Sequence, residues 1–150
     1  MKSRLLLLLA TVALCTPIHP LRAAEHAANS KPDGVEWILR EINGKLAVPS
    51  VDGGLPALRL DAGKKQASGF SGVNRFFGSY ERTGEKLKFG ALEQTYMKGS
   101  PEERAAEIAF MQALQGVSNW RVSKGVLELL KGEKVVLRFT VGAVQDSAKP

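Results

Sequence analysis

Apolar and polar residues alternate with a period of two over much of the chain. The alternation is clearest at residues 134–141, where one side carries Val135, Leu137, Phe139 and Val141. A strand with one buried and one solvated face has this period, which is typical of antiparallel sheets. Further strands are expected at residues 35–42, 58–60, 87–89, 120–123 and 126–130, with glycines at the turns between them. On these strands we expect four aromatic side chains to be largely buried: Trp37, Phe89, Trp120 and Phe139.

One segment has the period of a helix instead. Ser100-Pro101-Glu102-Glu103 is a capping box with proline at the first helical position, and it predicts a helix over about residues 101–115. Its apolar residues at helical spacing are Ile108, Met111 and Leu114, with Ala105 and Phe110 nearby. The predicted fold is therefore mainly β (α+β), an antiparallel curled sheet or partly open barrel of about 7–8 strands packed with one α-helix.

The N-terminus has the layout of a secretory signal peptide. A basic start at residues 1–4 precedes an apolar stretch at 5–15, which is too short to span a bilayer, and small residues follow up to Ala24. We predict a signal peptide over residues 1–23, a disordered leader over 24–34, a domain over 35–141 and a disordered tail over 142–150. No second apolar run follows, so we expect no transmembrane segment and a periplasmic or secreted protein.

Removal of this segment changes the charge and the cysteine content. Lys2, Arg4 and Arg22 are lost, so the net charge falls from +6 to +3, with acidic and basic residues interspersed. The only cysteine, Cys15, also leaves, and Leu14 before it is larger than the residue that lipoprotein signals carry, so lipid anchoring is not expected. Binding of nucleic acid would require a concentrated basic stripe, and none is evident.

Few residues of the mature chain could carry catalysis. His26 is the only histidine that remains, and it lies in the predicted leader. A Ser-His-Asp triad, a Cys-His pair and a thiolate metal site are therefore excluded. The adjacent Glu102 and Glu103 are explained by the favourable field at a helix start. We expect no enzymatic activity and no cofactor.

Residues 68–80 are dense in glycine, aromatic and polar residues, in the sequence SGFSGVNRFFGSY. The structural interpretation is a strand-turn-strand corner in which Asn74 satisfies buried backbone groups. The functional interpretation is a recognition loop that displays Asn74, Arg75, Phe77 and Tyr80.

This motif resembles the central motif of the META-domain (HslJ-like) family. The sequence WILREING at residues 37–44 is similar to the opening strand of the family, and LKFGAL at 87–92, followed by TYM at 95–97, is similar to a later segment. The resemblance runs from about Val35 to Thr140. It implies a small β-rich fold with one helix, no established catalytic residues, no cofactor, and an association with envelope stress and drug tolerance.

The chain departs from the family pattern at two positions. Many relatives have cysteine where Val73 and Gly99 stand here. If the two family positions are disulfide partners, Val73 and Gly99 are neighbours in the fold, with Cα atoms about 4.4–6.8 Å apart. Val73 would then be buried against the helix start, and Gly99 could require a positive φ.

Two functional hypotheses follow. The first is a monomeric, non-enzymatic interaction module of the cell envelope, whose partner is an envelope protein or a lipid. The alternative is a carrier of a lipophilic small molecule between sheet and helix, which would require a solvent-open groove lined by Trp37, Phe110 and Leu114.

Overall fold

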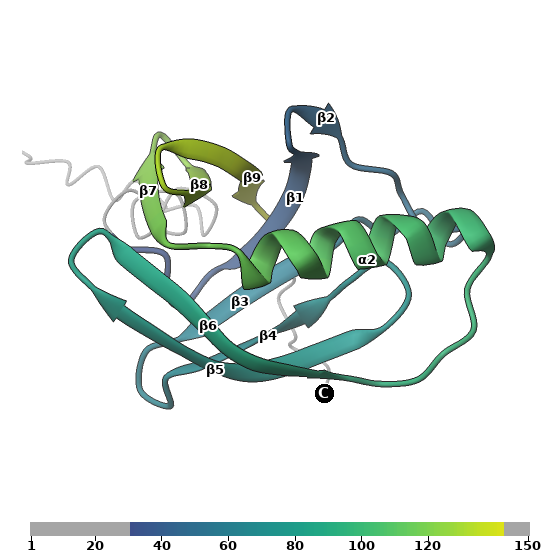
Figure 1. Ribbon diagram of the computed structural model, residues 1–150, viewed down its shortest axis with the longest axis horizontal. Coiled ribbons are helices and arrows are strands. Elements are labelled where there is room, and N and C mark those ends of the chain that lie inside the picture. The colour runs from purple at the N-terminus through teal and green to yellow at the C-terminus, as the bar shows by residue number, and fades with distance from the viewer. Residues whose placement is uncertain (1–30, 143–150) are drawn as a thin grey trace, which may run out of the picture.

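The computed structural model describes residues 31–142 (Figure 1). The predicted signal peptide, most of the predicted leader and the tail after Gly142 lie outside the described residues. The elements in chain order are β1 (Glu36–Ile42), β2 (Lys45–Leu46), β3 (Ala57–Asp61), β4 (Gln66–Phe70), β5 (Arg75–Thr83), β6 (Lys86–Gln94), α2 (Pro101–Gln115), β7 (Asn119–Ser123), β8 (Val126–Lys131) and β9 (Lys134–Val141).

The strands form one antiparallel sheet that curls into a ring. Their order is β2-β1-β3-β4-β5-β6-β7-β8-β9, and β1 pairs again with β9. The ring is weakest between β6 and β7, which share one register pair, Lys86↔Asn119. The helix lies along β6 beyond that pair, where Gln115 Nε2 donates to the carbonyl of Gly90 over 3.2 Å (Figure 1). The predicted curled sheet with one helix is confirmed; the described strands number nine because the two-residue β2 is included.

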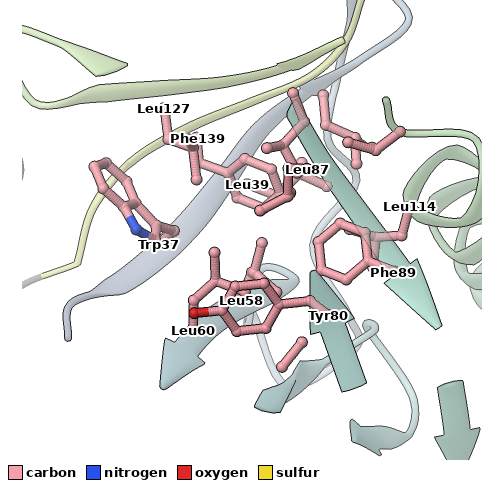
Figure 2. Close-up of a cluster of buried hydrophobic side chains, with 14 of the residues drawn as sticks. Trp37, Leu39, Leu58, Leu60, Tyr80, Leu87, Phe89, Leu114, Leu127 and Phe139 are labelled. Carbon is pink, nitrogen blue, oxygen red and sulfur yellow. The ribbon is translucent and has the colours of Figure 1, made fainter. Parts of the chain in front are cut away.

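The side chains inside the ring form one apolar core (Figure 2). Trp37 and Phe139 are fully buried and Phe89 is 8% exposed, as predicted. Trp120 is only partly buried, so the prediction was wrong there. The reason is its place at the weak β6–β7 edge, where its indole Nε1 donates to the carbonyl of Gly84 over 2.8 Å and the Arg82 guanidinium lies 5.3 Å from its ring centroid.

The helix begins with the predicted capping box. The Glu103 amide donates to the Ser100 hydroxyl over 3.2 Å, and the Ser100 amide donates to the Glu103 carboxylate over 2.9 Å. Glu103 also accepts from the backbone N–H of Val51 over 2.8 Å, which ties the β2–β3 loop to the helix start. The bonds from Val51 and Ser100 lower the pKa of Glu103.

The buried face of the helix differs from the predicted one. Its buried residues are Glu107, Phe110 and Leu114, whereas Ile108 is 53% exposed. Phe110 is the central contact, because its ring packs edge-on against Phe76, with centroids 5.8 Å apart, and against Phe139 at 6.4 Å. The helix is therefore turned so that positions 107, 110 and 114 face the core.

This orientation predicts a small effect of substituting Ile108. Replacing Ile108 with serine should change the free energy of unfolding by less than about 0.5 kcal/mol, because the side chain is half exposed and lies away from the core. Urea unfolding followed by circular dichroism measures this change. A loss of about 2 kcal/mol or more, typical of a truncated core residue, would show that the helix is rotated relative to our description.

The ordered contacts extend slightly beyond the predicted domain at both ends. The Trp37 indole donates to the carbonyl of Pro32 over 2.7 Å, and the Gly34 amide donates to the carbonyl of Leu60 over 3.0 Å. At the other end, the Gly142 amide donates to the carbonyl of Glu36 over 2.7 Å. Residues 32–34 and Gly142, which sequence analysis placed in the leader and the tail, thus contact the sheet.

Candidate functional site

Asn74 lies in the turn between β4 and β5 and is 6% exposed. The turn closes through the Ser71 amide, which donates to the carbonyl of Asn74 over 2.8 Å, and the Ser71 hydroxyl oxygen lies 2.8 Å from the same carbonyl. The amide oxygen of Asn74 accepts from the backbone N–H of Met97 over 2.7 Å. This is the corner in which an asparagine satisfies a backbone group, as the structural interpretation of the motif predicted.

A buried carboxylate completes the corner. Glu107 of α2 accepts from the Asn74 side-chain amide at 3.1 and 3.2 Å and from the Asn74 backbone N–H at 3.1 Å. The Ser71 hydroxyl and the Gln94 amide also donate to Glu107. All of these donors are uncharged, and together they fasten the helix to the motif. We call Ser71, Asn74, Gln94 and Glu107 the corner network.

Sequence reasoning did not identify Glu107. The available signal was its spacing, because Glu107, Phe110 and Leu114 occupy positions i, i+3 and i+7 of one helix face. An acidic residue at the first of these positions is normally assigned to solvent. Only its donors, which come from two other segments of the chain, explain why it is buried.

The segment after β6 is held by the same corner. The Thr95 amide donates to the carbonyl of Arg75 over 3.0 Å, and the Arg75 amide donates to the Thr95 hydroxyl over 3.1 Å. That hydroxyl donates in turn to the side-chain oxygen of Asn74 over 3.1 Å. The next two side chains project into solvent, with Tyr96 89% and Met97 65% exposed.

Val73 and Gly99 are neighbours, as the comparison with cysteine-containing relatives predicted. A Cβ atom added to Gly99 would lie 2.8 and 3.1 Å from the two γ-carbons of Val73. Val73 is half-buried there, and Gly99 directly precedes the helix cap at Ser100. Gly99 does not have a positive φ, contrary to our expectation.

The four residues of the predicted recognition loop divide into two pairs. Asn74 and Tyr80 are buried, and they point toward the corner network and the apolar core, respectively. Figure 2 shows the Tyr80 ring beside Leu58 and Leu60. The Tyr80 hydroxyl donates to Asp33, and burial together with this carboxylate raises its pKa.

The other pair faces outward. Arg75 is exposed and Phe77 is 44% exposed on the outer side of β5. Tyr96 and Met97 follow Thr95, which is bonded to Arg75 in both directions. We call Arg75, Phe77, Tyr96 and Met97 the display surface. Sequence reasoning identified its first two residues and missed the other two.

The space between sheet and helix is nearly filled. The gap at the mouth of the ring, between Leu39, Pro56 and Ala106, has a volume of about 20 Å³. A gap of that size holds roughly one water molecule. Trp37, Phe110 and Leu114 are fully buried rather than lining an open groove. This packing gives no support to the carrier alternative. Within residues 31–142, no helix is long and apolar enough to cross a membrane.

Comparison with known proteins gives the family. The chain is similar to a protein from Burkholderia xenovorans solved by NMR, with 28% identity and a TM-score of 0.61, over 89% of this chain and 95% of that one. A second NMR structure shares the fold at 21% identity and a TM-score of 0.56, over 71% of this chain and 88% of that one. No curated protein matches. The sequence model of the META domain family matches residues 31–143. The chain therefore belongs to the META domain family.

Proposed function

We propose that this protein is a non-enzymatic, exported interaction module of the cell envelope, which binds a partner through the display surface. The observation that carries the proposal is that large side chains are exposed on a backbone segment fixed by hydrogen bonds. Tyr96 and Met97 are exposed although the backbone beneath them is bonded to Asn74 and Arg75. A surface held in one conformation loses less entropy on binding than a flexible one.

The composition of the display surface also favours protein recognition. Tyrosine, phenylalanine, methionine and arginine are the residue types enriched in the cores of protein–protein interfaces. All four residues of the surface are of these types. Export is supported by the signal-peptide pattern of residues 1–23, and a role in stress or drug tolerance is supported by the family resemblance.

Site-specific photo-cross-linking tests the proposal. A photoreactive amino acid replaces Tyr96 in the full chain, expressed in a bacterium that exports it. We expect a discrete adduct in the envelope fraction that is lost when Arg75 and Phe77 are both replaced with alanine. The Ile108→Ser variant is the matched control, because Ile108 is an exposed apolar residue on the helix, and it should keep the adduct.

Three results would count against the proposal. The first is retention of the protein in the cytoplasm. The second is that a photoreactive residue at exposed Lys134 gives the same adducts as one at position 96. The third is an adduct that persists when Arg75 and Phe77 are replaced.

A further inference from the structure

The outer face of the sheet around Phe77 has a regular side-chain layout. One cross-strand row runs through Glu36, Arg59, Ser68, Phe77 and Glu93, which are register partners on β1, β3, β4, β5 and β6. Directly opposed side chains in such rows lie roughly 4.5–5.5 Å apart at Cβ. Phe77 therefore lies inside a continuous surface of side chains and not at a sheet edge.

An open hollow lies on each side of Phe77. One is lined by Arg59 and Arg75, with Glu36 in the same lining, and has a volume of about 350 Å³. The other is lined by Lys65, Gln66 and Glu93 and has a volume of about 470 Å³. Phe77 lines both, so the half-exposed ring forms a ridge between two hollows, each lined by charged and apolar residues together.

The basic side chains of this face are not neutralised within the described part of the chain. Arg59, Arg75 and Lys65 form no ion pair with any residue from 31 to 142, and the nearby Lys64 reaches Asp61 only at 4.0 Å. In contrast, Arg82, Arg121 and Arg138 each pair with a carboxylate. Basic residues elsewhere in the described part, such as Arg40, Lys45 and Lys134, also form no ion pair. Three unpaired cations nevertheless lie beside Phe77, on a face that also carries Glu36 and Glu93 at the ends of the row.

The spacing on β5 indicates the form of ligand that fits. Arg75 and Phe77 are two residues apart on one strand and point to the same side. Alternate residues of any extended chain are also roughly 6.5–7 Å apart on one side. An extended peptide along β5 can therefore place a carboxylate against Arg75 and an apolar side chain against Phe77.

We infer that the segment bound at the display surface is an extended acidic peptide of a partner protein, with an apolar side chain two residues from a carboxylate. This inference rests on the proposed function and adds the chemistry of the partner. Unpaired arginines favour carboxylates as ligands, because the guanidinium fork matches a carboxylate in a bidentate arrangement. The exposed ring supplies the apolar contact between the two hollows.

A labelled peptide that repeats Ser-Asp-Ser-Leu is the probe, and its binding to the full chain is followed by fluorescence anisotropy. We expect saturable binding that weakens as salt is raised. Replacing Arg59 and Arg75 together with glutamine should weaken binding about tenfold, and Phe77→Ala should have an effect of similar size. The matched control is Lys45→Gln with Lys134→Gln, which removes two exposed cations from other elements and should leave the affinity unchanged.

Several results would overturn the inference. One is the lack of saturable binding up to about 1 mM probe. Another is equal binding of a Ser-Asn-Ser-Leu peptide, which lacks the charge. A third is that the protein binds phosphatidylglycerol vesicles but not the peptide, and that vesicle binding depends on Arg59, Arg75 and Phe77. That result would mean that the face binds an anionic lipid surface.

The cross-linking experiment separates this inference from the proposed function. If the acidic probe fails but the Tyr96 adduct persists and depends on Arg75 and Phe77, the module binds a partner of different chemistry. If both experiments fail, the display surface is not a binding site.

Discussion

Replacing Asn74 with alanine is expected to destabilise the domain by about 3–5 kcal/mol. The Asn74 side chain donates twice to the buried Glu107 carboxylate and accepts from the Met97 amide and the Thr95 hydroxyl. Its removal leaves a buried charge with fewer donors and a backbone N–H without its acceptor. A buried group that loses its partner costs its full desolvation, roughly 1–3 kcal/mol each and more for a charge.

Two further variants make this prediction specific to the corner network. Glu107→Gln keeps the size of the side chain but replaces one carboxylate oxygen with an amino group. Asn74 donates to both carboxylate oxygens, so a donor would then face a donor, and this variant should also destabilise the domain. Gln112→Ala removes an exposed polar side chain from the same helix and should change the free energy of unfolding by less than about 0.5 kcal/mol.

Urea unfolding measures the three free energies, and hydrogen exchange of the Met97 amide reports on the bond to Asn74. We expect exchange of this amide to accelerate in Asn74→Ala. A cost below about 1 kcal/mol for both Asn74→Ala and Glu107→Gln would mean that water replaces the missing bonds and that the network does not brace the corner.

A disulfide between positions 73 and 99 is expected to stabilise the domain by about 3–4 kcal/mol. It would close a loop of 27 residues, counting both ends. In the chain-entropy account, that constraint removes conformations from the unfolded chain. The geometry is favourable, because a Cβ at Gly99 would lie 2.8 and 3.1 Å from the γ-carbons of Val73. A disulfide requires the two Cβ atoms to lie roughly 3.5–4.5 Å apart, so the two residues must be in side-chain contact.

The test is the double variant Val73→Cys with Gly99→Cys, compared in its oxidised and reduced forms by thermal and urea unfolding. Because Gly99 has no positive φ, a side chain there does not require left-handed backbone. The reduced form controls for the loss of Val73 packing, since it contains the same two substitutions without the bridge. Failure of the bridge to form under oxidation, or a melting temperature equal to that of the reduced form, would contradict the prediction.

Local sequence patterns determined the helix and most of the strands, although β2 (Lys45–Leu46) was not predicted, and the motif resemblance indicated the family. The helix start followed from Ser100, Pro101 and Glu103, because a capping box acts through residues that are close in sequence. The strand over 134–141 followed from alternation, which reports one buried face whatever the neighbouring strand is. The contact between Val73 and Gly99 was predicted from the cysteines that many relatives carry at these two positions.

The tertiary structure alone decided which side chains face inward where local patterns are ambiguous. Ile108 fits the apolar face of an isolated helix as well as Phe110 does, and only packing against Phe76 and Phe139 selects Phe110. Trp120 is apolar enough for the core, but the single β6–β7 register pair leaves it at an edge.

The same distinction applies to the candidate site. From the sequence, the polar and aromatic residues of the motif identified a corner, yet they did not show that Asn74 faces the core and Arg75 faces solvent. Glu107 is 33 residues from Asn74 in sequence, so no local pattern couples them. The fold brings the helix over the β4–β5 turn, and there a buried carboxylate is tolerated because donors from two other segments converge on it.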